Sequence, residues 1–218
     1  MRIVVVSSSP HKEKSSTFQL ACEVLKGLPA NDCAVEIIHL ADCALGFCLH
    51  CEACHAKILD CSLRDDAMEI AKKMMAADGI ILATPNYIHQ VTGSMKTIFD
   101  RSGHFIHCKR FLDKYVVGVV TSGSGDNKEV LDYLKFYTLV CGGQYSGGVS
   151  AMRHLEKAAL VEAFDLGAHL ALDITKKTRH PTQVAFLERD RKHFAPIVAA
   201  RKDEWVEEYR YWQKMGWL

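Results

Sequence analysis

Runs of β-branched and other apolar residues alternate along this chain with stretches of helical length, and this rhythm restricts the fold more than any other feature. The runs in Arg2–Ser7 and Gly79–Ala83 are continuously apolar over several residues, which indicates strands covered on both faces. The expected strands are Arg2–Ser7, Val35–Leu40, Gly79–Ala83, Tyr115–Val120 and Gln144–Val149. The expected helices are Ser16–Leu25, Asp66–Ala77 with Asp65 as N-cap, Ser94–Arg101, Lys128–Val140 and Leu155–Lys176. This alternation predicts an α/β fold, with a parallel sheet and helices on both faces.

Five strands in this rhythm predict a flavodoxin-like, doubly wound five-stranded parallel sheet with the spatial order 2-1-3-4-5. The sheet and its helices account for one domain over residues 1–178, and residues 179–218 are expected to form a C-terminal helical extension. Pro196 can begin a helix in this extension, because a proline at the first helical position gives up no helical hydrogen bond. The extension is rich in Trp and Tyr, so we expect it to contact a second copy of the chain; packing on its own domain is the alternative.

Composition excludes several function classes. The 218 residues carry 27 Lys and Arg against 26 Asp and Glu, and a net charge of +1 gives no support for binding nucleic acid or an anionic membrane. No apolar run approaches the ~20 residues of a membrane span, and the first apolar run is too short for a signal peptide. The nine cysteines are therefore expected in a reducing compartment, the cytoplasm, where clustered thiols favour metal or redox chemistry over disulfides.

The segment that follows the first strand is rich in hydroxyl groups. Six Ser or Thr side chains fall within Ser7–Thr17, directly before a helix. Ligands of doubly wound sheets bind at the carboxyl ends of the strands, and a helix N-terminus attracts phosphate. The alternative is that these side chains only cap the helix and fill a turn. Two nucleotide motifs are absent: there is no P-loop, and Lys128 stands where a dinucleotide fingerprint beginning at Gly123 would need its third glycine.

Two segments of the chain carry recognisable family motifs. Ser9-Pro10-His11-Lys12 and the later Ser16-Thr17 are similar to the S-P-x-K…[SN]-T phosphate loop of the NADPH-dependent FMN reductase and iron–sulfur flavoprotein families, with Ser8 in place of the usual glycine and one additional residue before Thr17. Thr84–Ile88, followed by Gly93–Lys96 and Phe99–Arg101, resembles their T-P-x-Y…G-x-[LM]-K-x-[FI]-x-D-R signature. The resemblance covers roughly residues 1–150.

The resemblance implies that FMN binds between the first loop, the Pro-x-Tyr segment and the glycine-containing loop after the fourth strand. Two glycines in this last loop would allow close backbone approach to a flat ring, although a flexible turn explains them equally well. The cofactor-binding residues implied are Ser9, His11, Lys12, Ser15, Ser16, Thr17, Pro85, Asn86, Tyr87, Ile88, Thr121, Ser122, Gly123 and Gly125. No catalytic side chain is expected, because the flavin carries the chemistry; His89 is a candidate proton donor near the ring.

Four cysteines lie within fourteen residues, in the spacing C-x2-C-x2-C-x6-C from Cys48 to Cys61. Four thiolates in so short a loop are typical of an iron–sulfur cluster. Structural zinc remains an alternative, although zinc sites usually separate two C-x2-C pairs by a longer loop. Cys51–His55 also matches a c-type haem attachment string, and reduced thiols that bind nothing are a further alternative. Cys22, Cys33, Cys108 and Cys141 are expected to be small, largely buried residues.

The resemblance implies that a [4Fe–4S] cluster is held in the loop 43–62 by Cys48, Cys51, Cys54 and Cys61, with Cys43 as a possible substitute ligand. It also implies a homodimer or a dimer of dimers. The expected function is that of an FMN-dependent electron-transfer oxidoreductase, with NAD(P)H as a possible donor and a quinone, oxygen or a protein as acceptor. The alternatives are an NAD(P)H-dependent FMN or quinone reductase without a cluster, and a non-enzymatic flavodoxin-like carrier.

Overall fold

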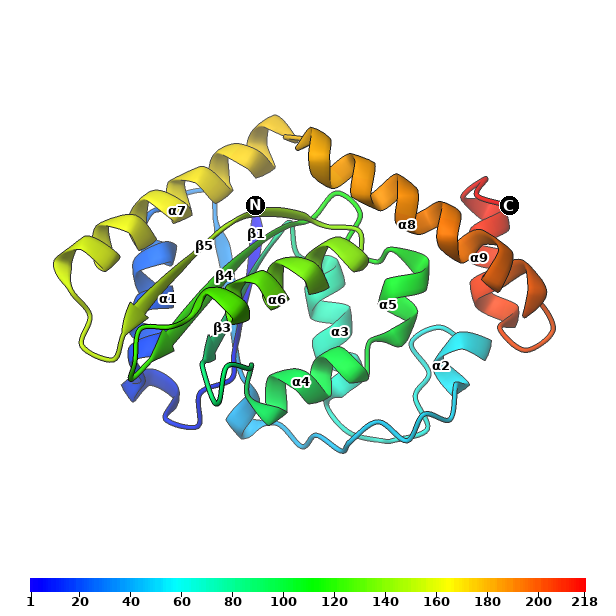
Figure 1. Cartoon of the computed structure of the whole chain (residues 1–218), viewed down its shortest axis with the longest axis horizontal. Coiled ribbons are helices and arrows are strands. Elements are labelled where there is room, and N and C mark those ends of the chain that lie inside the picture. Colours follow the sequence, from blue (N-terminus) through cyan, green and yellow to red (C-terminus); the bar gives the residue numbers. More distant parts are fainter.

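The computed structural model describes residues 1–218 and has a five-stranded parallel sheet at its centre (Figure 1). The strands are β1 (Arg2–Ser7), β2 (Ala34–His39), β3 (Gly79–Pro85), β4 (Tyr115–Ser122) and β5 (Gln144–Met152). Their spatial order is β2-β1-β3-β4-β5, and every neighbouring pair is parallel. The predicted fold class and strand order are confirmed.

Helices cover both faces of this sheet. The longer helices are α1 (Ser16–Lys26), α3 (Ala67–Ala76), α4 (Gly93–Asp100), α5 (Gly103–Cys108), α6 (Lys128–Val140), α7 (Lys157–Lys176), α8 (Pro181–Ala200) and α9 (Val206–Lys214). A single turn, α2 (Ala53–Ala56), and two 3-10 turns, Lys12–Lys14 and Leu40–Asp42, lie in the connections. None of these helices combines the length and the apolar character that crossing a membrane requires.

Alternate residues of the strands divide the core into two layers. Val4 and Ile80 point toward α3, α4 and α6, whereas Ile3 and Ile81 point toward α1 and α7. The contact between α1 and α7 is close: a Cβ atom at Gly167 would lie 1.9 Å from the carbonyl oxygen of Val24. Only glycine permits this approach, so α1 and α7 pack closely side by side on one face of the sheet.

The element boundaries differ from the predictions mostly by one to three residues. The first strand and the helix Lys128–Val140 occur as predicted, whereas β3, β4 and β5 run two or three residues further, because parallel pairing continues past the apolar core. The residue before α3 is Asp66, but the Asp65 side chain still accepts a hydrogen bond from the Ala67 amide, at 3.2 Å.

The prediction that Pro196 begins a helix was wrong. Pro181 occupies the first turn of α8, and Pro196 lies inside that helix, close to its end. A proline removes only one helical hydrogen bond, and the last turn of α8 is fixed by packing of Val198 against Trp205 and Trp212. Proline spacing alone therefore gave the wrong start, because packing from a later helix decides the length of α8.

The C-terminal extension packs on its own chain. Helix α8 runs from the end of α7 to the far side of the molecule, where α9 lies beside α2 and α5 (Figure 1). Trp205 and Trp212 are only 5% and 0% exposed, and both are buried against residues of the same chain. These two side chains are therefore not available to a second copy, and a dimer contact through the extension stays a prediction that depends on other residues.

Candidate functional site

A polar cavity of about 340 Å³ opens at the carboxyl ends of the strands. Eleven of the fourteen residues implied in cofactor binding line it together, although they come from three loops far apart in the sequence. These residues are Ser9, His11, Ser15, Ser16, Thr17, Pro85, Asn86, Tyr87, Thr121, Ser122 and Gly123. The carboxyl ends of parallel strands meet at one edge of the sheet, so the strand order by itself brings these loops together.

The N-terminus of α1 forms one wall of this cavity. Ser15 caps the helix, and its Oγ atom accepts a hydrogen bond from the Phe18 amide at 3.0 Å. The amides of Ser16 and Thr17 belong to the first turn and have no helical acceptor. Free amides and the positive end of the helix dipole make this wall a binding place for an anion such as phosphate.

Hydrogen bonds join the three loops to one another. Thr17 Oγ1 lies 2.6 Å from Thr121 Oγ1, and both residues are buried. The Asn86 amide donates to the Thr121 carbonyl at 2.8 Å, and the Asn86 side chain donates to the Asp126 carbonyl at 2.7 Å. A Cβ atom at Gly123 would meet nothing within 4 Å, so the cavity is open there. The chain alone thus fixes a polar cavity with an open side that a flat ring could occupy.

Two cationic residues of this cavity were missed by the sequence reasoning. Lys14 lies in the first loop, and Arg153 directly follows β5. The backbone of Arg153 is fixed at both ends, since its amide donates to the Ser122 carbonyl at 2.8 Å and its carbonyl accepts from Ser16 Oγ at 2.7 Å. The fifth strand ends at the same edge as the others, so a cation directly after it was a signal available in the sequence.

Three of the implied residues lie outside the cavity. Lys12 forms an ion pair with Asp42. Lys14, two residues further along the same loop, lines the cavity instead. Ile88 is 95% exposed. Gly125 has a φ of +83°, and its amide donates a hydrogen bond to Ser122 Oγ at 2.8 Å. His89 is exposed and pairs with Glu129 at 3.0 Å.

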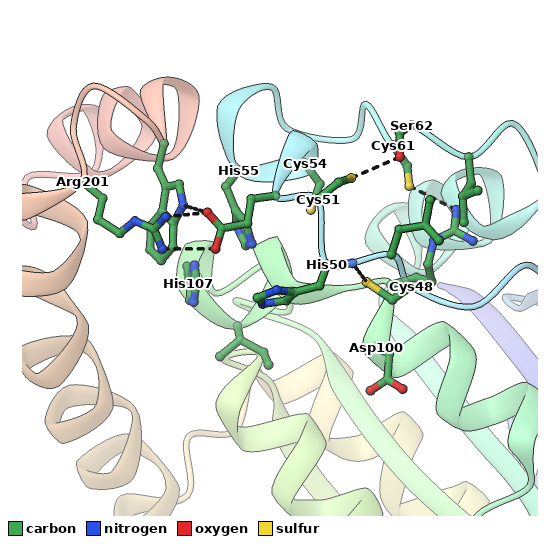
Figure 2. A pocket seen from close by; sticks show the side chains of 17 residues that line it. Cys48, His50, Cys51, Cys54, His55, Cys61, Ser62, Asp100, His107 and Arg201 are labelled. Carbon is green, nitrogen blue, oxygen red and sulfur yellow. Dashed lines mark hydrogen bonds and ion pairs between the residues drawn. The ribbon is translucent and has the colours of Figure 1, made fainter.

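A second cavity, of about 470 Å³, is lined by all four cysteines of the C-x2-C-x2-C-x6-C motif (Figure 2). Cys54 lies in α2, and the other three lie in the irregular chain on either side of it. The backbone takes left-handed conformations at His50 and Glu52, with φ of +50° and +58°. These two turns, one after Cys48 and one after Cys51, bend the chain so that closely spaced cysteines can share one cavity.

Two of the four thiols, those of Cys61 and Cys51, have polar side chains as hydrogen-bond partners. Arg101 is only 3% exposed, and its Nη2 atom donates to the Cys61 sulfur at 3.2 Å. Asp65 holds the guanidinium in place through contacts of 2.7 and 2.9 Å. The hydrogen bonds from Arg101 lower the pKa of Asp65 to about 2, so this carboxylate is charged at neutral pH. A hydrogen bond with Ser62, 3.1 Å away, lowers the pKa of the Cys51 thiol.

Cys54 behaves in the opposite way. Burial, the carboxylate of Glu208, and the nearby sulfurs of Cys61 and Cys48 raise its pKa to about 11. The sulfurs are therefore close enough to repel one another as thiolates. A bound metal would offset this repulsion and displace the thiol protons, so the four cysteines that line this cavity fit a thiolate-bound metal centre. The remaining cysteines are free, with Cys108 and Cys141 buried and Cys22, Cys33 and Cys43 partly buried.

Comparisons with known proteins identify a family and a fold. The family model for NADPH-dependent FMN reductases matches residues 1–177. An iron–sulfur flavoprotein of Archaeoglobus fulgidus is 28% identical over 223 aligned residues that cover all of both chains. Another, from Methanocaldococcus jannaschii, is 38% identical over 102 residues, which are 47% of this chain and 52% of that protein. The solved apo structure of an NADH:FMN oxidoreductase shares the fold with a TM-score of 0.62 and 23% identity, over 84% of this chain and 92% of that one.

Proposed function

The chain belongs to the family of NADPH-dependent FMN reductases and is an FMN-dependent oxidoreductase, and from this premise we propose that it is an iron–sulfur flavoprotein. In this proposal FMN binds in the cavity at the carboxyl ends of the strands, and a [4Fe–4S] cluster binds to Cys48, Cys51, Cys54 and Cys61. The observation that carries the proposal is the convergence of these four thiols on one cavity, separate from the polar one.

The polar cavity suits FMN because its two ends differ in chemistry. The amides of Ser16 and Thr17 would hold the phosphate, with Lys14 and Arg153 supplying positive charge. The segment Pro85–Tyr87 and the loop Thr121–Gly123 would border the ring system, where backbone amides and carbonyls can bond its polar edge. Bound flavin accepts an electron pair and releases single electrons, and the surrounding residues position it and exclude competing reactions.

The cysteine cavity suits a cluster because it combines four thiols with a buried cation. Iron–sulfur clusters take four Cys thiolates, and hydrogen bonds to their sulfurs tune the reduction potential. Arg101 would provide such a bond at Cys61, and Ser62 would provide one at Cys51. Zinc could use the same four thiolates, so metal analysis decides between the two.

The deciding experiment is anaerobic purification followed by flavin, iron, sulfide and zinc analysis and a visible spectrum. We expect about one FMN and about four irons and four sulfides per chain. Protein that contains FMN but neither metal nor sulfide would support the second candidate, an NAD(P)H-dependent FMN or quinone reductase without a cluster. The match to the FMN reductase family favours that reductase activity. Zinc without sulfide would replace the cluster by a structural metal site.

Donor, acceptor and assembly are further parts of the proposal. Rapid mixing of the anaerobic protein with NADH, NADPH or reduced ferredoxin identifies the donor by the rate of flavin bleaching. If only ferredoxin reduces the flavin, the protein is an electron carrier rather than a nicotinamide-dependent reductase. We also propose a homodimer or dimer of dimers in a reducing compartment such as the cytoplasm, consistent with nine free cysteines, and light scattering measures the assembly.

A further inference from the structure

The C-terminal extension contacts the cysteine loop (residues 43–62) at a point between two of the proposed cysteine ligands. Glu52 lies between Cys51 and Cys54, and its carboxylate accepts two hydrogen bonds from Arg201, at 2.5 and 3.2 Å. The indole Nε1 of Trp205 donates to the same carboxylate at 3.1 Å. The Arg201 guanidinium also lies over the Trp205 ring, 4.3 Å from its centroid. Arg201 and Trp205 both line the cysteine cavity, so the extension forms one of its walls (Figure 2).

Two further contacts reach the loop after Cys54. The Glu208 carboxylate is fully buried and bonds the Nδ1 atom of His55 at 2.6 Å, while its other oxygen bonds His107 of α5 at 2.9 Å. Glu207 accepts a hydrogen bond from the Ile58 amide at 2.7 Å. The extension thus contacts the loop at residues 52, 55 and 58, on both sides of Cys54.

The extension is itself fixed to the rest of the molecule. Trp212 is fully buried, and its indole donates to the His107 carbonyl at 3.1 Å. Asp190 of α8 forms an ion pair with the buried Lys109, which follows α5. The extension is therefore anchored to α5, and through its own contacts it fixes the cysteine loop relative to this helix.

The loop has little of its own to keep it in place. Cys48 and Cys51 are exposed, the only helix between them and Cys61 is the four-residue turn α2, and Glu52 has a left-handed backbone. A non-glycine residue persists in that conformation only where its surroundings hold it there. Beside the local bonds of its carbonyl with the His55 and Ala56 amides, Glu52 is held by its contacts with Arg201 and Trp205.

We infer that the segment 201–208 is a clamp that holds the cysteine loop in its ligand-bearing conformation, with Glu52, Arg201 and Trp205 as positioning residues. The inference rests on the proposed cluster for its purpose, but the clamp itself is a property of the chain. The clamp lies beyond residue 177, where the match to the FMN reductase family ends. This placement is consistent with an element that supports the cysteine loop rather than the polar cavity.

Hydrogen–deuterium exchange of the metal-free, FMN-loaded protein tests the clamp without any cluster. In Arg201→Met and Glu52→Gln, we expect amides of residues 48–58 to exchange at least tenfold faster, with the sheet amides and FMN affinity unchanged. The matched control is Glu204→Gln, because Glu204 also bonds Arg201 but does not touch the loop. When Arg201→Met and Glu52→Gln are combined, these amides should exchange no faster than in Glu52→Gln alone, because both substitutions remove the same contact.

A second measurement uses the reconstituted protein. Arg201→Met should shorten the half-life of iron retention under a chelator at least fivefold, whereas Glu204→Gln should not. Should Arg201→Met misfold, Glu207→Gln removes a charge from one loop contact only and should accelerate exchange at the Ile58 amide. Unchanged exchange in all three loop variants overturns the clamp. If the wild-type chain binds no cluster but the variants exchange faster, the clamp is supported and the proposed function is overturned. If the cluster assembles but exchange is unchanged in the variants, the proposed function is supported and the clamp is overturned.

Discussion

The two cavities of this molecule are built in different ways. In the polar cavity, where we propose that FMN binds, hydrogen bonds of the backbone continue the pairing of the sheet: the Ser8 amide bonds the Ala83 carbonyl, and the Asn86 amide bonds the Thr121 carbonyl. In the cysteine cavity, charged side chains make the decisive contacts, such as Arg101 with Asp65. The first cavity therefore follows from the strand order, whereas the second depends on particular side chains meeting across the chain.

The largest expected effect separates the two cavities completely. We expect Cys51→Ala to abolish binding of the cluster, because the site then has three thiolates in place of four. FMN should remain bound at the wild-type stoichiometry, since no residue lines both cavities. Iron, sulfide and flavin analysis of the same anaerobic preparation measures both effects. Loss of FMN together with iron would mean that the loop supports the whole fold and that the two cavities are not independent.

Arg101→Met removes the buried cation of the cysteine cavity. Asp65 would lose its partner, and breaking this half-buried ion pair on one side should cost about 2 kcal/mol, between the values typical of exposed and of buried pairs. We expect a lower urea midpoint with an unchanged slope, and weaker retention of iron. Asp65→Asn is the matched control, because it keeps the guanidinium beside Cys61 and removes only the carboxylate charge. Equal stability of Arg101→Met and wild type would contradict the role given to this pair.

Thr17→Ala tests whether FMN binds in the polar cavity. The Thr17 hydroxyl bonds Thr121 across two loops, and one hydrogen bond is worth about 1–2 kcal/mol when it orders a charged ligand's site. We expect FMN to dissociate roughly five- to thirtyfold more readily, measured by fluorescence quenching. Iron content should stay at its wild-type value. An unchanged affinity would place the phosphate elsewhere.

The acid stability of the cysteine cavity should depend on Asp65. Because its pKa is about 2 in the folded protein and 3.8 in its ordinary state, the carboxylate stabilises the fold above pH 4 and loses this contribution as the pH falls toward 2. The pair is partly screened by solvent, so we expect a change of about 1 kcal/mol. Urea titrations between pH 5 and 2.5 measure it. In Asp65→Asn, the free energy of unfolding should change less over this pH range. If it falls in parallel with that of the wild type, other carboxylates dominate the acid response.

The same difference explains what the sequence could predict. The sheet order, three converging loops and the four clustered cysteines all follow from local patterns placed on a parallel sheet. Arg153 was missed although its position after the fifth strand made it accessible to the same argument. The contacts of Glu52 and His55 could not be predicted, because nothing in a local pattern specifies that a segment about 150 residues later supplies Arg201 and Glu208. The helix containing Pro196 was misplaced for the same reason.

The smallest expected effect concerns two neighbouring lysines. Lys12 matches the family pattern but pairs with Asp42, whereas Lys14 does not match it and lines the polar cavity. We expect Lys14→Met to weaken FMN binding about threefold, since exposed charge contacts contribute less than about 1 kcal/mol. Lys12→Met should leave the affinity within twofold, and raising the salt concentration should reduce the difference between the variants. If Lys12→Met had the larger effect, the first loop would rearrange when FMN binds, and the view that this cavity is already formed in the chain would be wrong.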